Sequence, residues 1–310
     1  MSRQPEACDG EPSAPAAGAE ELDQLIDRCT FGEIERRELV CGVSGGADSA
    51  ALLVLACRFA QRSGNDVTAV TAVHIDHGIR ADGAAEAERV GALCDQLGAS
   101  LRIVRLGLAA GANLQARARE ARNAALGPEA LVGHTADDQA ETVLLQLLRG
   151  GALDALAAMR ADRRPLLVLR RADTDRVCEI AGYEPIQDPS NADPRFWRSR
   201  VRHELIPLLC DISGRDVVPL LARAAGLAAT DADLLDLLAA DIDPTSAAEL
   251  RTAPLALARR AVRAWLRTDH PPDAATVERV LEVARHTHRA TEVGGGRRVT
   301  RSADQLRLEG

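Results

Sequence analysis

The chain has 310 residues, 46% of them hydrophobic, which is enough for about two domains with full cores. No apolar run approaches the roughly 18 residues that span a bilayer, and the first residues lack the layout of a signal peptide. We therefore expect a cytoplasmic protein without a membrane anchor. Seven scattered cysteines without a Cys-x-x-Cys pair argue against a zinc knuckle or an iron–sulfur cluster.

The net charge of −8 argues weakly against a nucleic acid partner, but the charges are unevenly distributed. Residues 1–36 carry nine acids and three arginines, whereas residues 251–301 carry eleven arginines and five acids. One part of the molecule can therefore face a phosphate backbone. All 38 basic residues are arginine, which excludes a catalytic lysine from this chain.

Residues 1–19 are rich in Pro, Ala, Gly and Glu, which predicts a disordered tail, and residues 20–36 have helical spacing. Short apolar or β-branched runs then alternate with helical patterns. The predicted strands are residues 39–43, 66–74, 101–106 and 130–133, and the predicted helices are residues 50–60, 84–97, 113–126 and 136–148. This alternation predicts an α/β fold with a doubly wound, mainly parallel sheet, in which ligands lie beyond the carboxyl ends of the strands.

The β signal nearly stops after about residue 212. The later patterns predict helices at residues 217–238, 247–266 and 274–286, and a small hairpin within residues 293–308. We therefore expect a catalytic domain over residues 20–212, followed by a smaller, largely helical domain over residues 213–310.

A turn rich in glycine and hydroxyl groups, Ser44-Gly45-Gly46-Ala47-Asp48-Ser49, joins the first predicted strand to an apolar helix. Backbone N–H groups and the positive end of the helix meet there, which makes the turn a candidate anion site. Asp48 is suited to holding a hydrated Mg²⁺. The turn lacks the Lys-Ser/Thr ending of a Walker loop and is similar to the pyrophosphate loop of N-type ATP pyrophosphatases. An ordinary glycine-rich turn is the alternative.

Two further groups of polar residues follow predicted strands. The sequence His74-Ile75-Asp76-His77 ends the second strand, and we interpret it as a polar loop beside the nucleotide rather than a metal site. After the fourth strand, Thr135 is placed to cap a helix on which Asp138 and Glu141 share a face, with Asp137 close by. These acids are explained either by the helix dipole or by a site for Mg²⁺ or an ammonium-bearing substrate.

Two arginine-rich stretches are candidates for binding anions. Arg119 and Arg122 lie three residues apart on a predicted helix, where they form either a phosphate-binding pair or a solvated basic face. The block at residues 195–202 combines four arginines with two adjacent aromatic residues, which suits phosphate contacts and base stacking. Its alternative is an amphipathic helix that buries Phe196 and Val201.

The loop at residues 44–49, the acidic segment at residues 133–142 and the sequence Asp188-Pro189-Ser190-Asn191 occur in an order typical of one enzyme family. Over residues 39–207 the chain resembles the bacterial tRNA(Ile)-lysidine synthetases. Such enzymes adenylate carbon 2 of the wobble cytidine in an isoleucine tRNA with a CAU anticodon. Free lysine then displaces AMP through its ε-amino group, which gives lysidine.

The resemblance implies a ligase that forms a carbon–nitrogen bond, uses ATP and Mg²⁺, and acts on tRNA and lysine; a homodimer is one candidate assembly. The implied catalytic residues are Asp48, Asp137, Asp138, Glu141 and Arg119, with Asp48 and Asp138 as the metal ligands. The implied nucleotide-binding residues are Ser44, Gly45, Gly46, Ala47, Asp48, Ser49, His74 and His134. The implied tRNA-binding residues are Arg80, Arg122, Asn191, Phe196, Arg198, Arg200 and Arg202.

The sequence departs from the family pattern at Asn123, where the family usually has tyrosine, and at Ser199, where it usually has asparagine. These departures concern RNA or substrate contacts rather than ATP chemistry. Two other functions remain alternatives. One is tRNA thiolation by a related enzyme, against which the missing Cys-x-x-Cys counts. The other is a non-catalytic RNA-binding module, against which the intact loop and acids count.

Overall fold

The computed structural model describes residues 14–76, 83–106, 117, 121, 124–187, 195–268 and 271–310. The chain divides into two compact units between Ala225 and Gly226. The domain boundary that the sequence predicts near residue 212 lies before this division. The reason is that Val218 and Leu221, which follow the last predicted β signal, still pack around Ala136 and Ala140 of the first unit.

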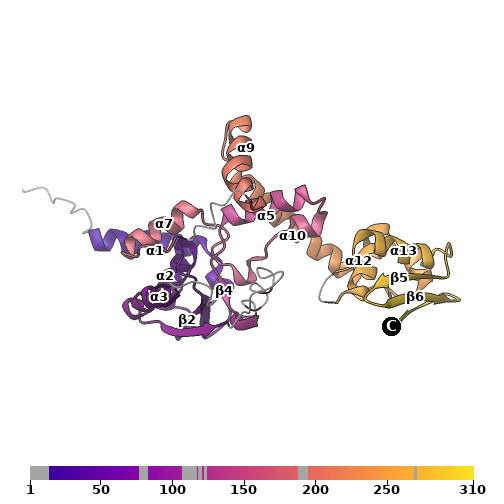
Figure 1. The fold of residues 1–310 in the computed structure, drawn as a ribbon, viewed down its shortest axis with the longest axis horizontal. Helices are drawn as coiled ribbons and strands as arrows, with labels where there is room; N and C mark the ends of the chain where they lie inside the picture. The colour runs from indigo at the N-terminus through magenta and orange to yellow at the C-terminus, as the bar shows by residue number, and fades with distance from the viewer. Residues whose placement is uncertain are drawn as a thin grey trace, which may run out of the picture. The chain divides into compact units, whose positions relative to one another are not determined.

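The described part of the first unit contains a parallel sheet (Figure 1), and its strands lie in the order β3-β2-β1-β4. Its strands are β1 (Glu38–Gly42), β2 (Ala69–Asp76), β3 (Ser100–Arg105) and β4 (Leu131–Val132). The sheet confirms the predicted α/β fold. After β3 the chain crosses to the other side of β1, so the strand order reverses between β1 and β4. Ligands of such sheets bind outside the carboxyl ends of the strands at this switch point.

Helices cover the sheet and extend the first unit. They are α1 (Ala14–Arg28), α2 (Ala47–Ala60), α3 (Gly83–Leu97), α5 (Ala136–Leu148), α6 (Leu153–Leu156), α7 (Arg171–Ile180), α8 (Trp197–Arg200) and α9 (Ile206–Ser213). Short turns occur at η1 (Thr30–Glu33) and η2 (Ala161–Arg163), and a π-helical turn, η4 (Val201–Leu205), joins α8 to α9. Of the predicted helix at residues 113–126, the structure describes helical residues at 117, 121 and 124–126.

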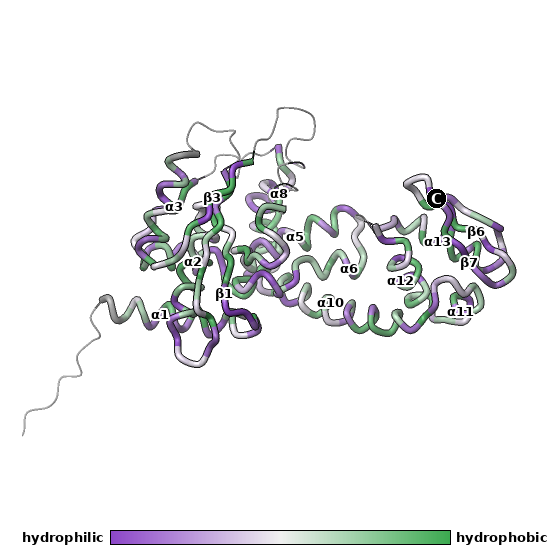
Figure 2. Tube along the Cα trace, turned by 90° about the horizontal axis from the view of Figure 1, so that it is seen from below, coloured by the Kyte–Doolittle hydropathy of each residue, from purple (hydrophilic) through white to green (hydrophobic). Residues whose placement is uncertain are grey.

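The α2 helix lies at the centre of the first unit, beside β1 (Figure 2). It contacts β1 and β2 on one side and α1 and α7 on the other. This position explains why its residues from Ser49 to Cys57 are all buried, and why the sequence there is apolar on every face. The turn before α2 is therefore held by a rigid core.

The first helix begins inside the segment predicted as a disordered tail. Residues 14–19 are helical, because α1 starts at Ala14. Leu25 and Ile26 of the same helix are buried in the main core. This packing anchors the helix, and its alanine-rich start continues the helical turns towards the N-terminus.

The second unit contains the rest of α10 (Val218–Ala239), three further helices and a small sheet. The helices are α11 (Ala247–Thr252), α12 (Leu255–Leu266) and α13 (Ala274–Ala284), and the strands are β5 (Ala290–Gly294), β6 (Arg297–Ser302) and β7 (Gln305–Glu309). The sheet is antiparallel, so the predicted hairpin has one strand more than expected. The helix predicted over residues 247–266 is broken at Pro254, where proline lacks the N–H that a helix interior needs. No helix in the described ranges is long and apolar enough to cross a membrane.

Candidate functional site at the carboxyl ends of β1 and β4

The turn at residues 44–49, which we call the phosphate loop, follows β1 and leads into α2. The backbone N–H of Ser44 donates to Ser49 Oγ at 3.1 Å, and Ser49 Oγ donates to the carbonyl of Gly46 at 2.9 Å. Gly46 caps α2 without any side-chain hydrogen bond. The first N–H groups of α2 are consequently left for an external acceptor, which is the arrangement of a helix N-terminus that binds phosphate.

Gly45 is required by the shape of the phosphate loop. Its φ of +88° lies in the region that favours glycine, and an added Cβ would lie 2.4 Å from Ile186 Cδ1. Its carbonyl accepts hydrogen bonds at 2.9 Å from the backbone N–H of Ile186 and from Tyr183 Oη. The segment that follows α7, which contains Tyr183 and Ile186, therefore holds the phosphate loop in place through Gly45.

Gly133 brings the end of β4 against the first turn of α2. A Cβ at this position would lie 2.3 Å from the backbone carbonyl oxygen of Asp48. Only glycine permits this approach without a backbone shift. The approach places the acids at the start of α5 next to the phosphate loop.

The two histidines predicted beside the nucleotide have structural partners. His74 is 2% exposed, and its Nδ1 lies 2.9 Å from the carbonyl oxygen of Val43. It therefore braces the end of β1 from inside the core. His134 Nδ1 accepts a hydrogen bond from Arg164 Nε at 3.1 Å.

The start of α5 is organised by a capping box between Thr135 and Asp138. The backbone N–H of Thr135 donates to Asp138 Oδ2 at 3.0 Å, and the Thr135 hydroxyl donates to the same oxygen at 3.2 Å. This confirms the predicted N-cap. Burial alone would raise the pKa of Asp138, but the Thr135 N–H and the guanidinium groups of Arg198 and Arg171 outweigh it and lower the pKa.

Three arginines surround Glu141, whose side chain is fully buried. Arg202 Nε lies 2.6 Å from Glu141 Oε1 and Arg198 Nε lies 2.8 Å from Oε2. Arg171 reaches both acids of this helix face, at 3.3 Å from Glu141 Oε1 and 3.4 Å from Asp138 Oδ1. A buried carboxylate is tolerated only with such partners, so these ion pairs neutralise the acids.

Asp137 faces a different set of partners from Asp138. Arg170 contacts both of its oxygens, with Nε–Oδ2 at 3.0 Å and Nη2–Oδ1 at 3.1 Å. The backbone N–H of Arg171 also donates to Asp137 Oδ2 at 2.9 Å. Arg170 forms a further ion pair with Asp216. Burial opposes ionisation of Asp137, but these contacts prevail and lower its pKa.

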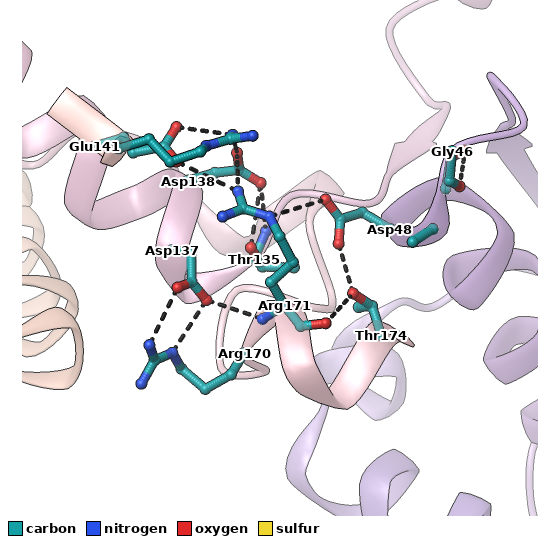
Figure 3. A network of polar contacts seen from close by, with 12 residues as sticks. Gly46, Asp48, Thr135, Asp137, Asp138, Glu141, Arg170, Arg171 and Thr174 are labelled. Carbon is teal, nitrogen blue, oxygen red and sulfur yellow. Dashed lines mark hydrogen bonds and ion pairs between the residues drawn. The ribbon is translucent and has the colours of Figure 1, made fainter. Parts of the chain in front are cut away.

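Asp48 belongs to the phosphate loop and faces the start of α7 (Figure 3). Thr174, which is fully buried, donates its hydroxyl proton to Asp48 Oδ1 at 2.6 Å. Arg171 Nε lies 3.9 Å from Asp48 Oδ2. Burial is the largest influence on Asp48 and raises its pKa to about 6, against the lowering effect of Thr174.

The predicted metal ligands are Asp48 and Asp138. They differ in how many of their carboxylate oxygens already accept hydrogen bonds or form ion pairs within the protein. No group of three or more histidine, cysteine or acidic side chains arranged for a metal occurs among the described residues. Mg²⁺ bound together with a nucleotide needs no such group, because it takes one or two carboxylates, phosphate oxygens and water. Asp48 fits this role. Asp138 fits it less well, since Thr135 and the arginines occupy both of its oxygens.

The predicted tRNA-binding block has two faces. Arg198 and Arg202 point towards the acids of α5, whereas Arg200 pairs with Glu204 at 2.7 Å. Phe196 and Trp197 are 36% and 59% exposed, whereas Val201 is buried, so the alternative that buries both Phe196 and Val201 is right for Val201 and wrong for Phe196. An open groove of about 450 Å³ lies beside this second face and is lined by Leu148, Trp197, Arg200, Val201, Glu204, Leu205 and Leu208. The predicted residues Arg80, Arg119, Arg122 and Asn191 lie outside the described residues.

Sequence reasoning missed Arg170, Arg171 and Thr174 at the start of α7. The sequence does contain a clue to these residues. Two consecutive arginines at a helix N-terminus are unfavourable because they repel the positive end of the helix dipole, so such a pair indicates nearby acidic partners. The structure supplies those partners in the carboxylates of Asp137 and Asp138.

Two family models match separate parts of the chain. A PP-loop domain matches residues 17–209, and a TilS substrate binding domain matches residues 246–307. The PP-loop match contains the phosphate loop, the acids of α5 and the start of α7. It therefore implies that this domain binds ATP.

Curated relatives match most of the chain. The chain is 43% identical to a tRNA(Ile)-lysidine synthase from Nocardia farcinica, over 72% of this chain and 74% of the relative. It is 41% identical to a tRNA(Ile)-lysidine synthase from Mycolicibacterium paratuberculosis, over 76% of each protein. A solved U34-tRNA thiolase from Methanococcus maripaludis shares the fold, with a TM-score of 0.54 and 16% identity over 70% of this chain and 80% of that chain.

Proposed function

Because the chain belongs to the tRNA(Ile)-lysidine synthase family, we propose that it joins lysine to carbon 2 of the wobble cytidine of isoleucine tRNA. The tRNA carries a CAU anticodon, ATP is consumed, and the products are lysidine, AMP and pyrophosphate. The observation that carries the proposal is the occurrence of a PP-loop domain and a TilS substrate binding domain in one chain. As an enzyme that modifies tRNA, it acts in the cytoplasm.

In the first step the base oxygen attacks the α-phosphate of ATP, and pyrophosphate leaves. The phosphate loop and the uncapped N-terminus of α2 hold the pyrophosphate through backbone N–H groups and the hydroxyls of Ser44 and Ser49. Asp48 is the residue that would hold Mg²⁺, which offsets phosphate charge when bound.

In the second step an amine of lysine attacks carbon 2, and AMP leaves. The pocket around Asp138 and Glu141 already binds three guanidinium groups, so it is suited to one of the cationic groups of lysine. Asp137 lies outside this pocket, because its side chain forms its ion pair with Arg170. We therefore assign the amine-binding role to Asp138 and Glu141.

The tRNA is proposed to approach over the block at residues 195–202, where the exposed Phe196 and Trp197 offer surfaces for base stacking. Arg200 is exposed on the same block and can contact phosphate. Residues 246–307, which match the TilS substrate binding domain, are assigned the remaining tRNA contacts.

Thiolation of tRNA is the weaker alternative. Burial raises the pKa of Cys94 to about 11 and that of Cys57 and Cys178 to about 12, so these thiols are poor nucleophiles. Cys41 is fully buried and its pKa is raised for the same reason. These four cysteines therefore offer no reactive thiolate for sulfur transfer.

The test is to incubate the protein with ATP, Mg²⁺, labelled lysine and isoleucine tRNA bearing a CAU anticodon. We expect lysine to become attached to the tRNA with release of AMP and pyrophosphate. A tRNA with a CAU anticodon that normally carries methionine is the matched control. Absence of transfer to the authentic tRNA would refute the proposal, and sulfur incorporation instead of lysine would support thiolation.

A further inference from the structure

The start of α7 contacts acids on two other helices. Thr174 and Arg171 contact the two oxygens of Asp48 on α2, at 2.6 Å and 3.9 Å. Arg171 also extends to Asp138 and Glu141 on α5 (Figure 3). One turn of α7 therefore joins Asp48 of the phosphate loop to the acids beyond β4.

The backbone around these side chains is closely packed. Cys178 Sγ on α7 lies 3.5 Å from the carbonyl oxygen of Ala47, and the backbone N–H of Ala136 donates to the carbonyl of Leu169 at 2.8 Å. The α7 helix is thus fixed against α2, and the residue two positions before its start is fixed against α5. Because Thr174 and Arg171 of α7 contact Asp48, this packing determines where the Asp48 carboxylate lies.

Thr174 is placed to restrict one rotation in particular. The Asp48 carboxylate can turn about its last side-chain bond, and the hydrogen bond from Thr174 fixes Oδ1. The other oxygen, Oδ2, then faces Arg171 at a distance too long for a strong hydrogen bond. This leaves Oδ2 as the oxygen that can receive a further ligand.

We propose that Thr174 and Arg171 are positioning residues, which orient Asp48 so that Oδ2 faces the nucleotide and align it with Asp138 and Glu141. The proposal rests on the proposed function, because it assigns Asp48 to the ATP site of that reaction. Neither residue needs to touch the substrate for this role. Loss of the Thr174 hydroxyl is therefore expected to affect the nucleotide and not lysine, whereas Arg171, which also contacts Asp138 and Glu141, affects both.

The decisive variant is Thr174→Val, which keeps the shape of the side chain and removes the hydroxyl. Thr174→Ser restores the hydroxyl. Thr71→Val is the matched control, because the Thr71 hydroxyl also donates to a carboxylate, Glu38 Oε1 at 2.8 Å, but lies on β2 away from the phosphate loop. Arg171→Gln tests whether Arg171 aligns Asp48 with Asp138 and Glu141. This test remains possible if the Thr174→Val variant fails to fold.

Binding of α,β-methylene ATP with Mg²⁺ is measured by calorimetry in the full chain. Loss of a hydrogen bond to a charged group predicts that Thr174→Val weakens this binding roughly tenfold, with Thr174→Ser within about threefold of the natural protein. The KM for lysine is expected to change less than about twofold, and Thr71→Val is expected to bind the nucleotide normally.

Unchanged nucleotide binding in both Thr174→Val and Arg171→Gln would overturn the proposal. A folded Thr174→Ser variant that binds no better than Thr174→Val would overturn the role of the hydroxyl. Because nucleotide binding is measured without tRNA or lysine, it remains informative if lysine transfer fails. Failure of transfer with normal nucleotide binding would count against the proposed function alone.

Discussion

Gly133→Ala tests the contact between the end of β4 and the first turn of α2. The new Cβ would lie 2.3 Å from the backbone oxygen of Asp48 and 2.7 Å from its carbonyl carbon. Two backbone segments would have to move apart by roughly 0.7 Å, because neither neighbour is a flexible side chain. Overpacking of this kind costs about 2–3 kcal/mol of the free energy of unfolding, which corresponds to roughly 5–10 °C in Tm.

The same shift separates the phosphate loop from the acids of α5. A misplacement of about 1 Å in a catalytic arrangement can lower a rate on the order of 100-fold. We therefore expect Gly133→Ala to reduce pyrophosphate release in the presence of tRNA by about that factor. Urea denaturation followed by circular dichroism measures the stability, and pyrophosphate release is measured by a coupled assay.

Gly226→Ala is the matched control, because Gly226 lies within α10 and a Cβ there meets no atom within 4 Å. Replacement of an exposed helical glycine is expected to raise the stability by up to about 1 kcal/mol. A Gly133→Ala protein that unfolded within about 0.5 kcal/mol of the natural protein and released pyrophosphate at the same rate would show that this contact does not position the two segments.

Four further outcomes are expected. Glu141→Ala leaves the surrounding guanidinium groups without their buried partner and should lower the free energy of unfolding by about 3–5 kcal/mol, measured by urea denaturation; a loss under 1 kcal/mol would contradict the ion-pair geometry. Asp137 has a lowered pKa, so its pairing with Arg170 stabilises the protein above the ordinary carboxyl pKa of about 4. That stabilisation is lost as the pH falls through the lower pKa of the folded state, and Asp137→Asn should flatten this acid limb of the stability profile. Asp48→Ala should abolish AMP formation while tRNA binding persists; equal loss of both would disprove its role at the nucleotide. Arg200→Ala should weaken tRNA binding and make its salt dependence shallower. An unchanged affinity would show that Arg200 does not contact tRNA and serves only in its ion pair with Glu204.

The sequence was sufficient to predict the parallel sheet, because apolar strands and amphipathic helices alternate in the first 150 residues. It also located the phosphate loop and the cap at Thr135, both of which depend on local backbone requirements. It did not reveal the partners of the acids. Arg171 and Thr174 reach Asp48 only through the packing of α7 on α2, a contact between residues more than 120 positions apart.

The roles of Arg198 and Arg202 also depended on tertiary structure. Their spacing indicates one face of a basic helix, and that face is turned towards Glu141 rather than towards solvent. The third strand of the C-terminal sheet was missed for a different reason. Residues 305–309 form a short edge strand that is stabilised by its pairing with β6, and so short a segment carries a weak local signal.

The cluster that joins α2, α5, α7 and the basic block is electrically balanced. It contains equal numbers of carboxylates and guanidinium groups, which are Asp48, Asp138, Glu141, Arg171, Arg198 and Arg202. In the proposed reaction, an additional ammonium group would give this cluster a surplus positive charge beside the fully buried Glu141, which is costly. Lysine would therefore enter by exchange with a guanidinium group. Arg198, once released in this way, would be free to bind a phosphate of the tRNA, so the binding of lysine and the binding of tRNA would be coupled.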